Sequence, residues 1–586
     1  MTTLAAAPQM RVRSTGAGLF DHRRRALLVA RLRLLLLVLG FLALALCALG
    51  RIAWLGAARP GPQVQSMVTL LLPDRGEITD RNGLPLAREF PAYALWFNPE
   101  AMADGGEPLV RSPAQVADEL RKIFPDLDEA EVTDMLASRK AGYIRRRILP
   151  EDANKVQNIG ELALEITREK DRHYPQGSLA AHVLGYVAAD GHGRVGMEAV
   201  LDKRLLDPSL RGEPVALSID ARVQGALEDE LERGMLSVDA VGAAGIVLDV
   251  DTGEVLALAS KPGFDPNQIL TTDVVLPKEH TDAGEMPAVF NRLTNQVYEL
   301  GSTFKPLTVA VAIDTGVVTN LGRRWQANKP IKVGRYAIGD SHVIGDTLNV
   351  PETLIHSSNI VSAQIAGEIG GPTLHNYFGQ LGMNEAPYIE LPARGAPLGM
   401  GGTWDKTKAL YAGFGHGIAV TPLHLASAYA AMVNGGIWRP ATLNRIEPGH
   451  APRGRRVFKA STSARMNQLL RLIALYGTGK NADAPGFRVG GKTGSAEKPG
   501  VTGYRRTTLV STFAAAFPMD KPRYVVIAML DEPKGTRASS FQRTAAWNAA
   551  PIVGRLVSRI GPQLGVLPDA TRDIDLSDVR SLVGEE

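Results

Sequence analysis

The segment GSTFK, residues 301–305, places a hydroxyl and an amine three residues apart. On a helix, side chains with this spacing lie on one face, one turn from each other, so the amine of Lys305 can take a proton from the hydroxyl of Ser302. We expect Ser302 at the helix N-terminus, where the dipole favours developing negative charge, and Pro306 is tolerated in that first turn. These residues predict a nucleophilic serine with a lysine base. The alternative is a serine that only caps a helix.

A serine and a lysine at this spacing are weak evidence on their own, because about one such pair is expected by chance in a chain of this size. The sequence contains two, and the second, Ser495 to Lys498, is followed by Pro499-Gly500, which disfavours a helix. Only the pair that begins at Ser302 has the context that the chemistry requires.

Two further polar segments follow Ser302 in the chain. The segment HSSN, residues 356–359, follows a predicted helix and brings a hydroxyl and an amide together, and GGKTGSA, residues 490–496, is predicted to begin a strand loosened by glycine. Taken singly, they are interpreted as a helix cap and a turn. All three segments in this order are hard to assign to chance, so we predict one active site built from all of them.

The composition limits the classes of function. The chain has 586 residues, more than one compact domain usually holds, so two or three domains are expected. Its formal net charge of +4 is small for this length, which argues against nucleic-acid binding. The 11 histidines are scattered, with no HExxH and no CxxC pattern, so the sequence predicts neither a metal site nor a cofactor.

The N-terminal part of the chain predicts a membrane anchor. Residues 1–33 hold seven arginines and one acidic residue, and the 17 residues that follow carry no charge. As a helix this stretch spans about 26 Å, slightly short of a ~30 Å hydrocarbon core, and residues 52–55 extend it past Arg51, whose side chain can reach the interface. We therefore predict a cytoplasmic tail at 1–33, a transmembrane helix at 34–55 and an exported remainder.

Two other interpretations of this stretch remain open. The first is a cleaved signal peptide, although the stretch is longer than the apolar core of a usual signal peptide and no clean cleavage site follows closely. A lipoprotein signal ending at Cys47 would require a smaller residue than Leu46 before it. Since Cys47 is the only cysteine, the exported part can form no disulfide.

The exported part divides into a predicted non-catalytic pedestal at 56–225 and a second domain at 226–586. The second domain has apolar strand candidates near both of its ends, with a long helical region between them, which predicts an α+β fold whose sheet is closed by the two ends of the segment. The predicted strands are 244–249, 254–259, 509–517 and 524–530, the first two joined as a hairpin. The predicted helices are 114–123 and 129–138 in the pedestal and 305–314, 351–369, 422–433 and 463–476 in the second domain.

The three polar segments resemble the S-x-x-K, S-x-N and K-T-G motifs of penicillin-binding proteins and β-lactamases. Three segments of the predicted pedestal resemble class B penicillin-binding proteins: RGEITDRNG at 75–83, HVLGY at 182–186 and GME at 196–198. A β-lactamase or a small carboxypeptidase would lack these segments. The segments FDPN at 264–267 and GHG at 415–417 also match. Ser-Ser-Asn at the second motif resembles the division branch, penicillin-binding protein 3, whereas Leu300 and His356 depart from the usual residues.

The resemblance implies a fold and a set of roles. The second domain would be a penicillin-binding, β-lactamase-like transpeptidase domain, with an antiparallel sheet flanked by helices and a helical subdomain, preceded by an elongated pedestal and one transmembrane helix. The family's catalytic residues fall on Ser302, Lys305, Ser357, Asn359 and Lys492. Ser357 would relay a proton, and Asn359 would hold Lys305 and the substrate amide. Substrate would be bound by Thr493, Gly494 and Ser495, where serine replaces the usual threonine.

The resemblance also implies a function and partners. The chain would be a serine-type D-Ala-D-Ala transpeptidase of the cell inner membrane, cross-linking peptidoglycan stem peptides at the division septum and acylated by β-lactams. A polytopic SEDS-type glycan polymerase and other division proteins are the implied protein partners, and no nucleic acid is expected. The alternatives are an elongation transpeptidase, a carboxypeptidase, an acylated penicillin sensor and a non-catalytic scaffold.

Overall fold

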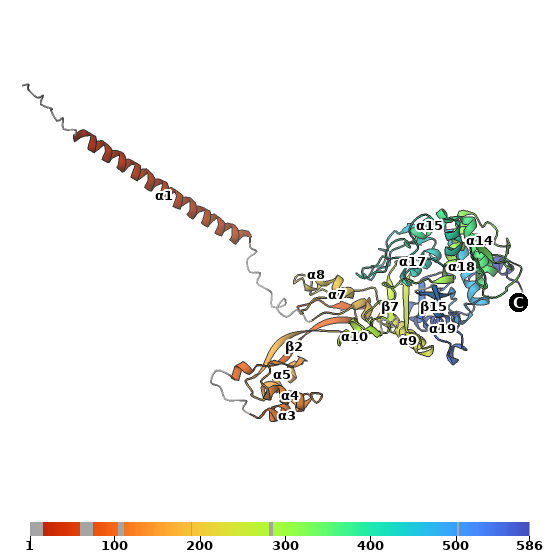
Figure 1. Cartoon of the computed structure of the whole chain (residues 1–586), viewed down its shortest axis with the longest axis horizontal. Helices are drawn as coiled ribbons and strands as arrows, with labels where there is room; N and C mark the ends of the chain where they lie inside the picture. The colour runs from red at the N-terminus through yellow and green to blue at the C-terminus, as the bar shows by residue number, and fades with distance from the viewer. Residues whose placement is uncertain are drawn as a thin grey trace, which may run out of the picture. The chain divides into compact units, whose positions relative to one another are not determined.

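A computed structural model describes residues 16–58, 74–102, 111–188, 190–279, 285–500 and 503–584 (Figure 1). The chain divides into two compact units, Met1–Leu72 and Pro73–Glu586. The first contains one long helix, α1 (Gly16–Ala58), whose segment Arg31–Arg51 is long and apolar enough to cross a membrane. The leucines of this segment are exposed, as lipid-facing side chains must be. Helix α1 fits a single-pass membrane anchor and extends beyond the predicted span 34–55 on both sides.

The first half of the second unit is built on a sheet of five strands. The long strand β2 (Pro85–Phe97) pairs antiparallel with β1 (Ile78–Thr79), β3 (Gly142–Ile148) and β4 (Leu164–His173), and β1 pairs parallel with β5 (Val215–Ala216). Three helices accompany the sheet: α3 (Pro113–Ile123), α4 (Glu129–Ala137) and α5 (Pro150–Gln157). Their apolar faces share one buried cluster with Leu95 and Phe97 of β2.

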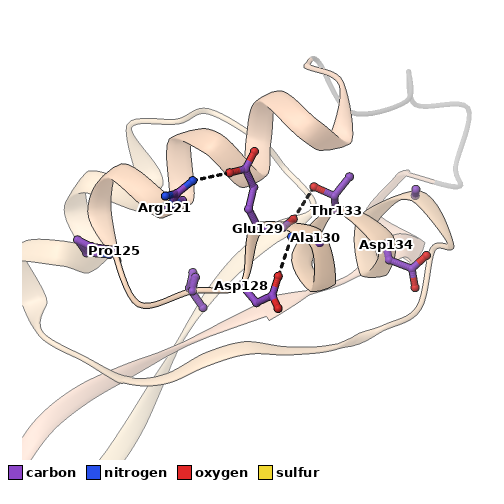
Figure 2. Close-up of a pocket in the computed structure, with 9 residues that line it drawn as sticks. Arg121, Pro125, Asp128, Glu129, Ala130, Thr133 and Asp134 are labelled. Carbon is purple, nitrogen blue, oxygen red and sulfur yellow. Dashed lines mark hydrogen bonds and ion pairs between the residues drawn. The ribbon is translucent and has the colours of Figure 1, made fainter.

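Helices α3 and α4 begin where the sequence predicts them, within one residue. Ser112 and Gln115 form a reciprocal capping box at the start of α3, and Asp128 accepts a hydrogen bond from the N–H of Ala130 at the start of α4 (Figure 2). The hollow that Figure 2 shows is lined by residues of these two helices and of the turn between them. It contains none of the predicted site residues.

Two of the pedestal segments meet in a buried ionic cluster. Glu198 is fully buried and accepts hydrogen bonds from Arg75 Nε (2.8 Å) and Arg172 Nε (2.7 Å). Arg75 also donates to Asp202 (2.7 Å), and Arg172 donates to the carbonyl of Gly76 (2.7 Å). A carboxylate at this depth is tolerated because both arginines neutralise and hydrogen-bond it.

The second half contains a five-stranded antiparallel sheet in the order β14-β15-β16-β6-β7. Its strands are β6 (Gly242–Asp249), β7 (Val255–Lys261), β14 (Gly490–Gly500), β15 (Gly503–Phe517) and β16 (Tyr524–Asp531). Both ends of the predicted second domain therefore supply the sheet, and 244–249 and 254–259 pair as a hairpin, as predicted. Every residue of β6 and β16 is buried, and since successive side chains point to opposite faces, these two strands are covered on both sides.

Each face of this sheet is covered by helices. Helices α9 (Ala221–Ser237) and α19 (Ala549–Ile560) pack on one face, whereas α12 (Lys305–Thr315), α17 (Pro422–Val433) and α18 (Ala460–Tyr476) share the core on the other (Figure 1). The predicted boundary between residues 225 and 226 falls inside α9, because the sequence cue was the first apolar strand rather than the helix before it.

The prediction of a single helix over residues 351–369 is wrong. Residues 351–369 form two helices, α13 (Val350–Ile355) and α14 (Asn359–Ile369), because Ser357 adopts the left-handed conformation with φ of 60°. The predicted helices at 305–314 and 422–433 are present as α12 and α17.

The remaining elements are short. The helices are η1 (Pro99–Met102), α6 (Ala181–Leu184), α7 (Gly196–Val200), α8 (Asp202–Leu206), α10 (Thr271–Val274), η2 (Gly301–Phe304), α15 (Gly371–Gln380), α16 (Lys406–Ala412), η3 (Lys480–Ala482), η4 (Arg537–Ser539), η5 (Pro562–Leu564) and α20 (Ser577–Arg580). The strands are β8 (Trp325–Gln326), β9 (Ile331–Val333), β10 (Tyr336–Ile338), β11 (Thr347–Leu348), β12 (Ile437–Trp438) and β13 (Arg455–Arg456).

Replacing Glu198 by alanine should strongly destabilise the pedestal, since two buried guanidinium groups lose their shared carboxylate. We expect a loss of about 3–5 kcal/mol of unfolding free energy, measured by urea denaturation of the purified chain. Glu119→Ala, which removes an exposed ion pair with Lys122 on α3, is the matched control and should leave the unfolding curve unchanged. Equal stability of the two variants would contradict the assigned role of Glu198.

Candidate active site

The predicted nucleophile lies on a short 3-10 turn that runs directly into a helix. Turn η2 (Gly301–Phe304) precedes α12, so Ser302 is partly exposed while Lys305 is completely buried. The hydroxyl of Tyr429 on α17 donates to the carbonyl of Thr303 (2.7 Å) and ties the turn to the core. Among the described residues, the Ser302 hydroxyl has no hydrogen-bond partner, so the contact between Ser302 and Lys305 that proton transfer requires is not formed.

The three polar segments meet at Ser357. Lys305 donates from Nζ to the hydroxyl of Ser357 at 3.0 Å and also to its carbonyl oxygen. Lys492 donates from Nζ to the same hydroxyl at 2.9 Å. One serine oxygen therefore joins an amine from α12 to an amine from β14, through residues that are 52 and 135 positions away in the chain.

Burial of the two amines changes their protonation. Lys305 and Lys492 both have no exposed surface, and loss of hydration disfavours a charged amine. Burial, together with the positive charge of Lys492, lowers the pKa of Lys305 well below its ordinary value, and burial lowers the pKa of Lys492 to about 7. The site therefore desolvates Lys305 and places Lys492 beside it.

The KTG segment lies on β14, the edge strand of the sheet. Lys492 Nζ also donates to the carbonyl and hydroxyl of Thr493 (3.0 and 3.2 Å), and the Thr493 hydroxyl pairs with that of Thr478 (2.7 Å). The hydroxyl of Ser495 accepts a hydrogen bond from the N–H of Ala545 (3.0 Å). The second Ser-x-x-Lys pattern, Ser495 to Lys498, is in this strand, so its context is not helical.

Gly494 lets the strand approach the nucleophile turn. A Cβ atom at this position would lie 2.3 Å from the carbonyl oxygen of Leu300 and 2.9 Å from the Cγ2 of Thr303. No side chain fits that space. The lack of a side chain at Gly494 therefore sets the distance between β14 and the turn that carries Ser302.

Known proteins share this arrangement of domains. Residues 243–554 match the family model of the penicillin-binding protein transpeptidase domain, and residues 71–246 match that of the penicillin-binding protein dimerisation domain. The probable peptidoglycan D,D-transpeptidase FtsI of Caulobacter vibrioides is 38% identical over 508 residues, which cover 84% of this chain and 82% of the relative. The chain belongs to the penicillin-binding protein family.

Two other similarities agree with this assignment. The peptidoglycan D,D-transpeptidase FtsI of Escherichia coli K12 is 28% identical over 571 residues, covering 92% of this chain and 91% of the relative. The crystal structure of penicillin-binding protein 3 from Mycobacterium tuberculosis complexed with aztreonam has a TM-score of 0.63 at 22% identity, covering 85% of this chain and 98% of that one, and shows the same fold. The predictions of a class B, division-type penicillin-binding protein and of its fold are confirmed.

One predicted contact of the candidate site is absent among the residues that the structure describes. The resemblance implied that Asn359 holds Lys305, but Asn359 Nδ2 donates to the carbonyl of Gly339 at 3.1 Å, and Lys305 is held by Ser357. Asn359 is the first residue of α14, and its side chain is bound to the segment after β10 instead. Within the described ranges, no group of three or more histidine, cysteine, aspartate or glutamate side chains is arranged to hold a metal ion.

The sequence did not point to three residues that contact the candidate site. Thr478 contacts Thr493, Tyr429 holds the nucleophile turn, and Asp340 contacts the residues after Ser357. Each comes from a segment distant in the chain. Asp340 has no local signal, whereas Tyr429 could have been sought as the large hydroxyl-bearing side chain in a mostly apolar predicted helix.

Gly494→Ala should fold normally apart from β14 and lose at least about 100-fold in acylation rate, because a misplaced reacting group costs about that much. The second-order rate of acylation by a chromogenic β-lactam is the measurement. Gly401→Ala is the control, since a Cβ at Gly401 meets no atom within 4 Å. Acylation of both variants at the wild-type rate would show that Gly494 does not set the geometry.

Proposed function

We propose that this chain cross-links peptidoglycan stem peptides as a serine-type D,D-transpeptidase, with Ser302 as the nucleophile, in septal wall synthesis. The observation that carries the proposal is the convergence of Lys305 and Lys492 on the hydroxyl of Ser357, in a chain of the penicillin-binding protein family whose Ser302 lies in the turn just before Lys305. Two buried amines of lowered pKa joined by one hydroxyl form a path for protons.

In the acylation step, the Ser302 hydroxyl attacks the carbonyl between the two terminal D-alanines of a stem peptide. The Ser302 proton passes to neutral Lys305, and the carbon–nitrogen bond breaks as Ser357 relays a proton to the departing amine of D-alanine. An ester to Ser302 remains. The backbone N–H groups of Ser302 and Ser495 would stabilise the oxyanion, and one such donor is worth roughly 10²–10³ in rate.

In the second step, the amine of another stem peptide attacks the ester. The new amide bond forms as the ester carbon–oxygen bond breaks, and the proton lost by the amine returns to Ser302 through the same lysine. A β-lactam follows only the first step: its ring opens on Ser302, the amine stays attached, and the ester hydrolyses slowly.

Substrate binding is assigned to the edge of β14. An extended peptide can add to this strand by main-chain hydrogen bonds, and its terminal carboxylate would lie against Lys492, Thr493 and Ser495. Gly494 keeps the strand close enough for the scissile carbonyl to reach Ser302.

Membrane placement and partners complete the proposal. The arginines before the apolar segment of α1 favour a cytoplasmic N-terminus, which puts the transpeptidase domain on the periplasmic side of the inner membrane. Support for a septal role comes from the division-type motif Ser-Ser-Asn and from the FtsI relatives. We place the chain with a polytopic SEDS-type glycan polymerase and other division proteins; filamentation on depletion would distinguish this role from elongation, where cells become round.

Incubation of the purified chain with benzylpenicillin should give one covalent adduct per chain, detected by intact mass and mapped to Ser302. Ser302→Ala should give none, because no other hydroxyl has the same context. Ser495→Ala, which changes the second Ser-x-x-Lys pattern, should still be acylated. An adduct on any other residue, or its persistence in Ser302→Ala, would refute the assignment of the nucleophile.

The acylation rate should depend on pH as a bell. It should rise on the acid side as Lys305 becomes neutral, and fall above about pH 7 as Lys492, whose pKa is about 7, loses the charge that binds the substrate carboxylate. The measurement is the second-order acylation rate between about pH 5 and pH 9. Lys492→Arg keeps its charge throughout this range and should lose the alkaline fall; Lys498→Arg, outside the site, should keep it. A flat wild-type profile would contradict these protonation states.

A further inference from the structure

A carboxylate that no motif contains lies against the SSN segment. Asp340 accepts hydrogen bonds from the hydroxyl of Ser358 (2.7 Å), from the N–H of Ile360 (3.2 Å) and from the N–H of Asn359. The preceding carbonyl, of Gly339, accepts from the side chain of Asn359 (3.1 Å). Residues 339–340 therefore hold the first turn of α14 with four hydrogen bonds.

These bonds act on the residue that the two lysines share. Ser357 has a φ of 60°, a conformation that costs a non-glycine residue free energy and persists only where the surroundings impose it. It is the link between the end of α13 and the start of α14. A carboxylate at the N-terminus of α14 satisfies its free N–H groups and complements the helix dipole, which fixes the point from which Ser357 projects.

Asp340 is itself held by packing. It follows strand β10, which forms an antiparallel hairpin with β9. Ile338 at the end of β10 is buried against Ala363 of α14 and Leu410 of α16. The hairpin therefore has an apolar anchor on the helix whose N-terminus its carboxylate caps, and the carboxylate is positioned by the fold rather than by the flexibility of a loop.

Asp340 also contributes charge to the site. Among the described residues, the charged groups that act on Lys305 are Lys492, from β14, and Asp340, from the segment after β10. The α13–α14 link contributes the neutral hydroxyl and carbonyl of Ser357. Lys492 repels a proton on Lys305, and Asp340 attracts it.

We propose that Asp340 is a positioning residue of the transpeptidase: it holds the left-handed Ser357 between Lys305 and Lys492, and its negative charge is the counter-charge of that buried pair. The proposal rests on the proposed function, since it concerns the proton path of the same site. Asp340 contacts neither Ser302 nor the reacting atoms, so it acts through Ser357 and Lys305.

The test is the pH profile of acylation by a chromogenic β-lactam, with the full chain in detergent. In Asp340→Asn, the limiting rate should fall about 10-fold because the cap is weakened. The acid limb, the part of the profile in which the rate rises with pH, should move about one pH unit lower, because Lys305 loses an attracting charge and its pKa falls further. Ser358→Ala, which removes one bond to Asp340 but keeps the charge, should lower the rate without moving the limb. Asp340→Glu should restore the limb.

A neighbouring acid gives the matched control. Asp346 is an exposed carboxylate of the same segment that accepts from Asn328, and Asp346→Asn should leave both rate and profile unchanged. If Asp340→Asn does not fold, Asp340→Ser, which keeps a capping oxygen without the charge, replaces it. An unmoved acid limb in a folded, charge-free variant would overturn the proposal. Failure of the wild-type chain to be acylated at Ser302 would instead refute the proposed function.

Discussion

The site depends on the cost of placing two amines out of water beside one hydroxyl. Lys305 and Lys492 are both fully buried and both donate to Ser357. Two positive charges this close repel each other strongly in a low-dielectric interior, and each has lost its hydration. Loss of one proton relieves both penalties, so the burial that destabilises the charged amines also favours the neutral amine that the proposed acyl transfer needs.

The rest of the fold supplies rigidity to that pair. Lys305 enters from a helix packed on one face of the sheet, Lys492 from the edge strand of the same sheet, and Ser357 from a break between two helices. None of these elements positions its neighbours alone. They are brought to fixed spacing by the core cluster that α12, α17 and α18 share with the sheet, and by the missing side chain of Gly494, which sets how near the strand and the nucleophile turn approach.

What the sequence predicts about the site is local, and what it misses is not. The spacing of Ser302 and Lys305, the hairpin β6–β7 and the termini of α3 and α4 follow from periodicity and capping, which act within a few residues. The left-handed Ser357 interrupts a stretch whose apolar pattern continues, so local reasoning joined α13 and α14 into one helix. Asp340 reaches this break from a separate hairpin, and only tertiary packing brings the two together.

The same chain contains a second buried ionic cluster, and the comparison shows what differs at the active site. In the pedestal, Glu198 is enclosed by Arg75 and Arg172, so positive and negative groups face each other. In the transpeptidase domain the two buried groups have the same sign, and the carboxylate near them is only partly buried and is occupied with the N–H groups of α14. The first arrangement fixes structure because its charges are matched. The second leaves the lysines under-compensated, which disfavours a charge on both amines at once.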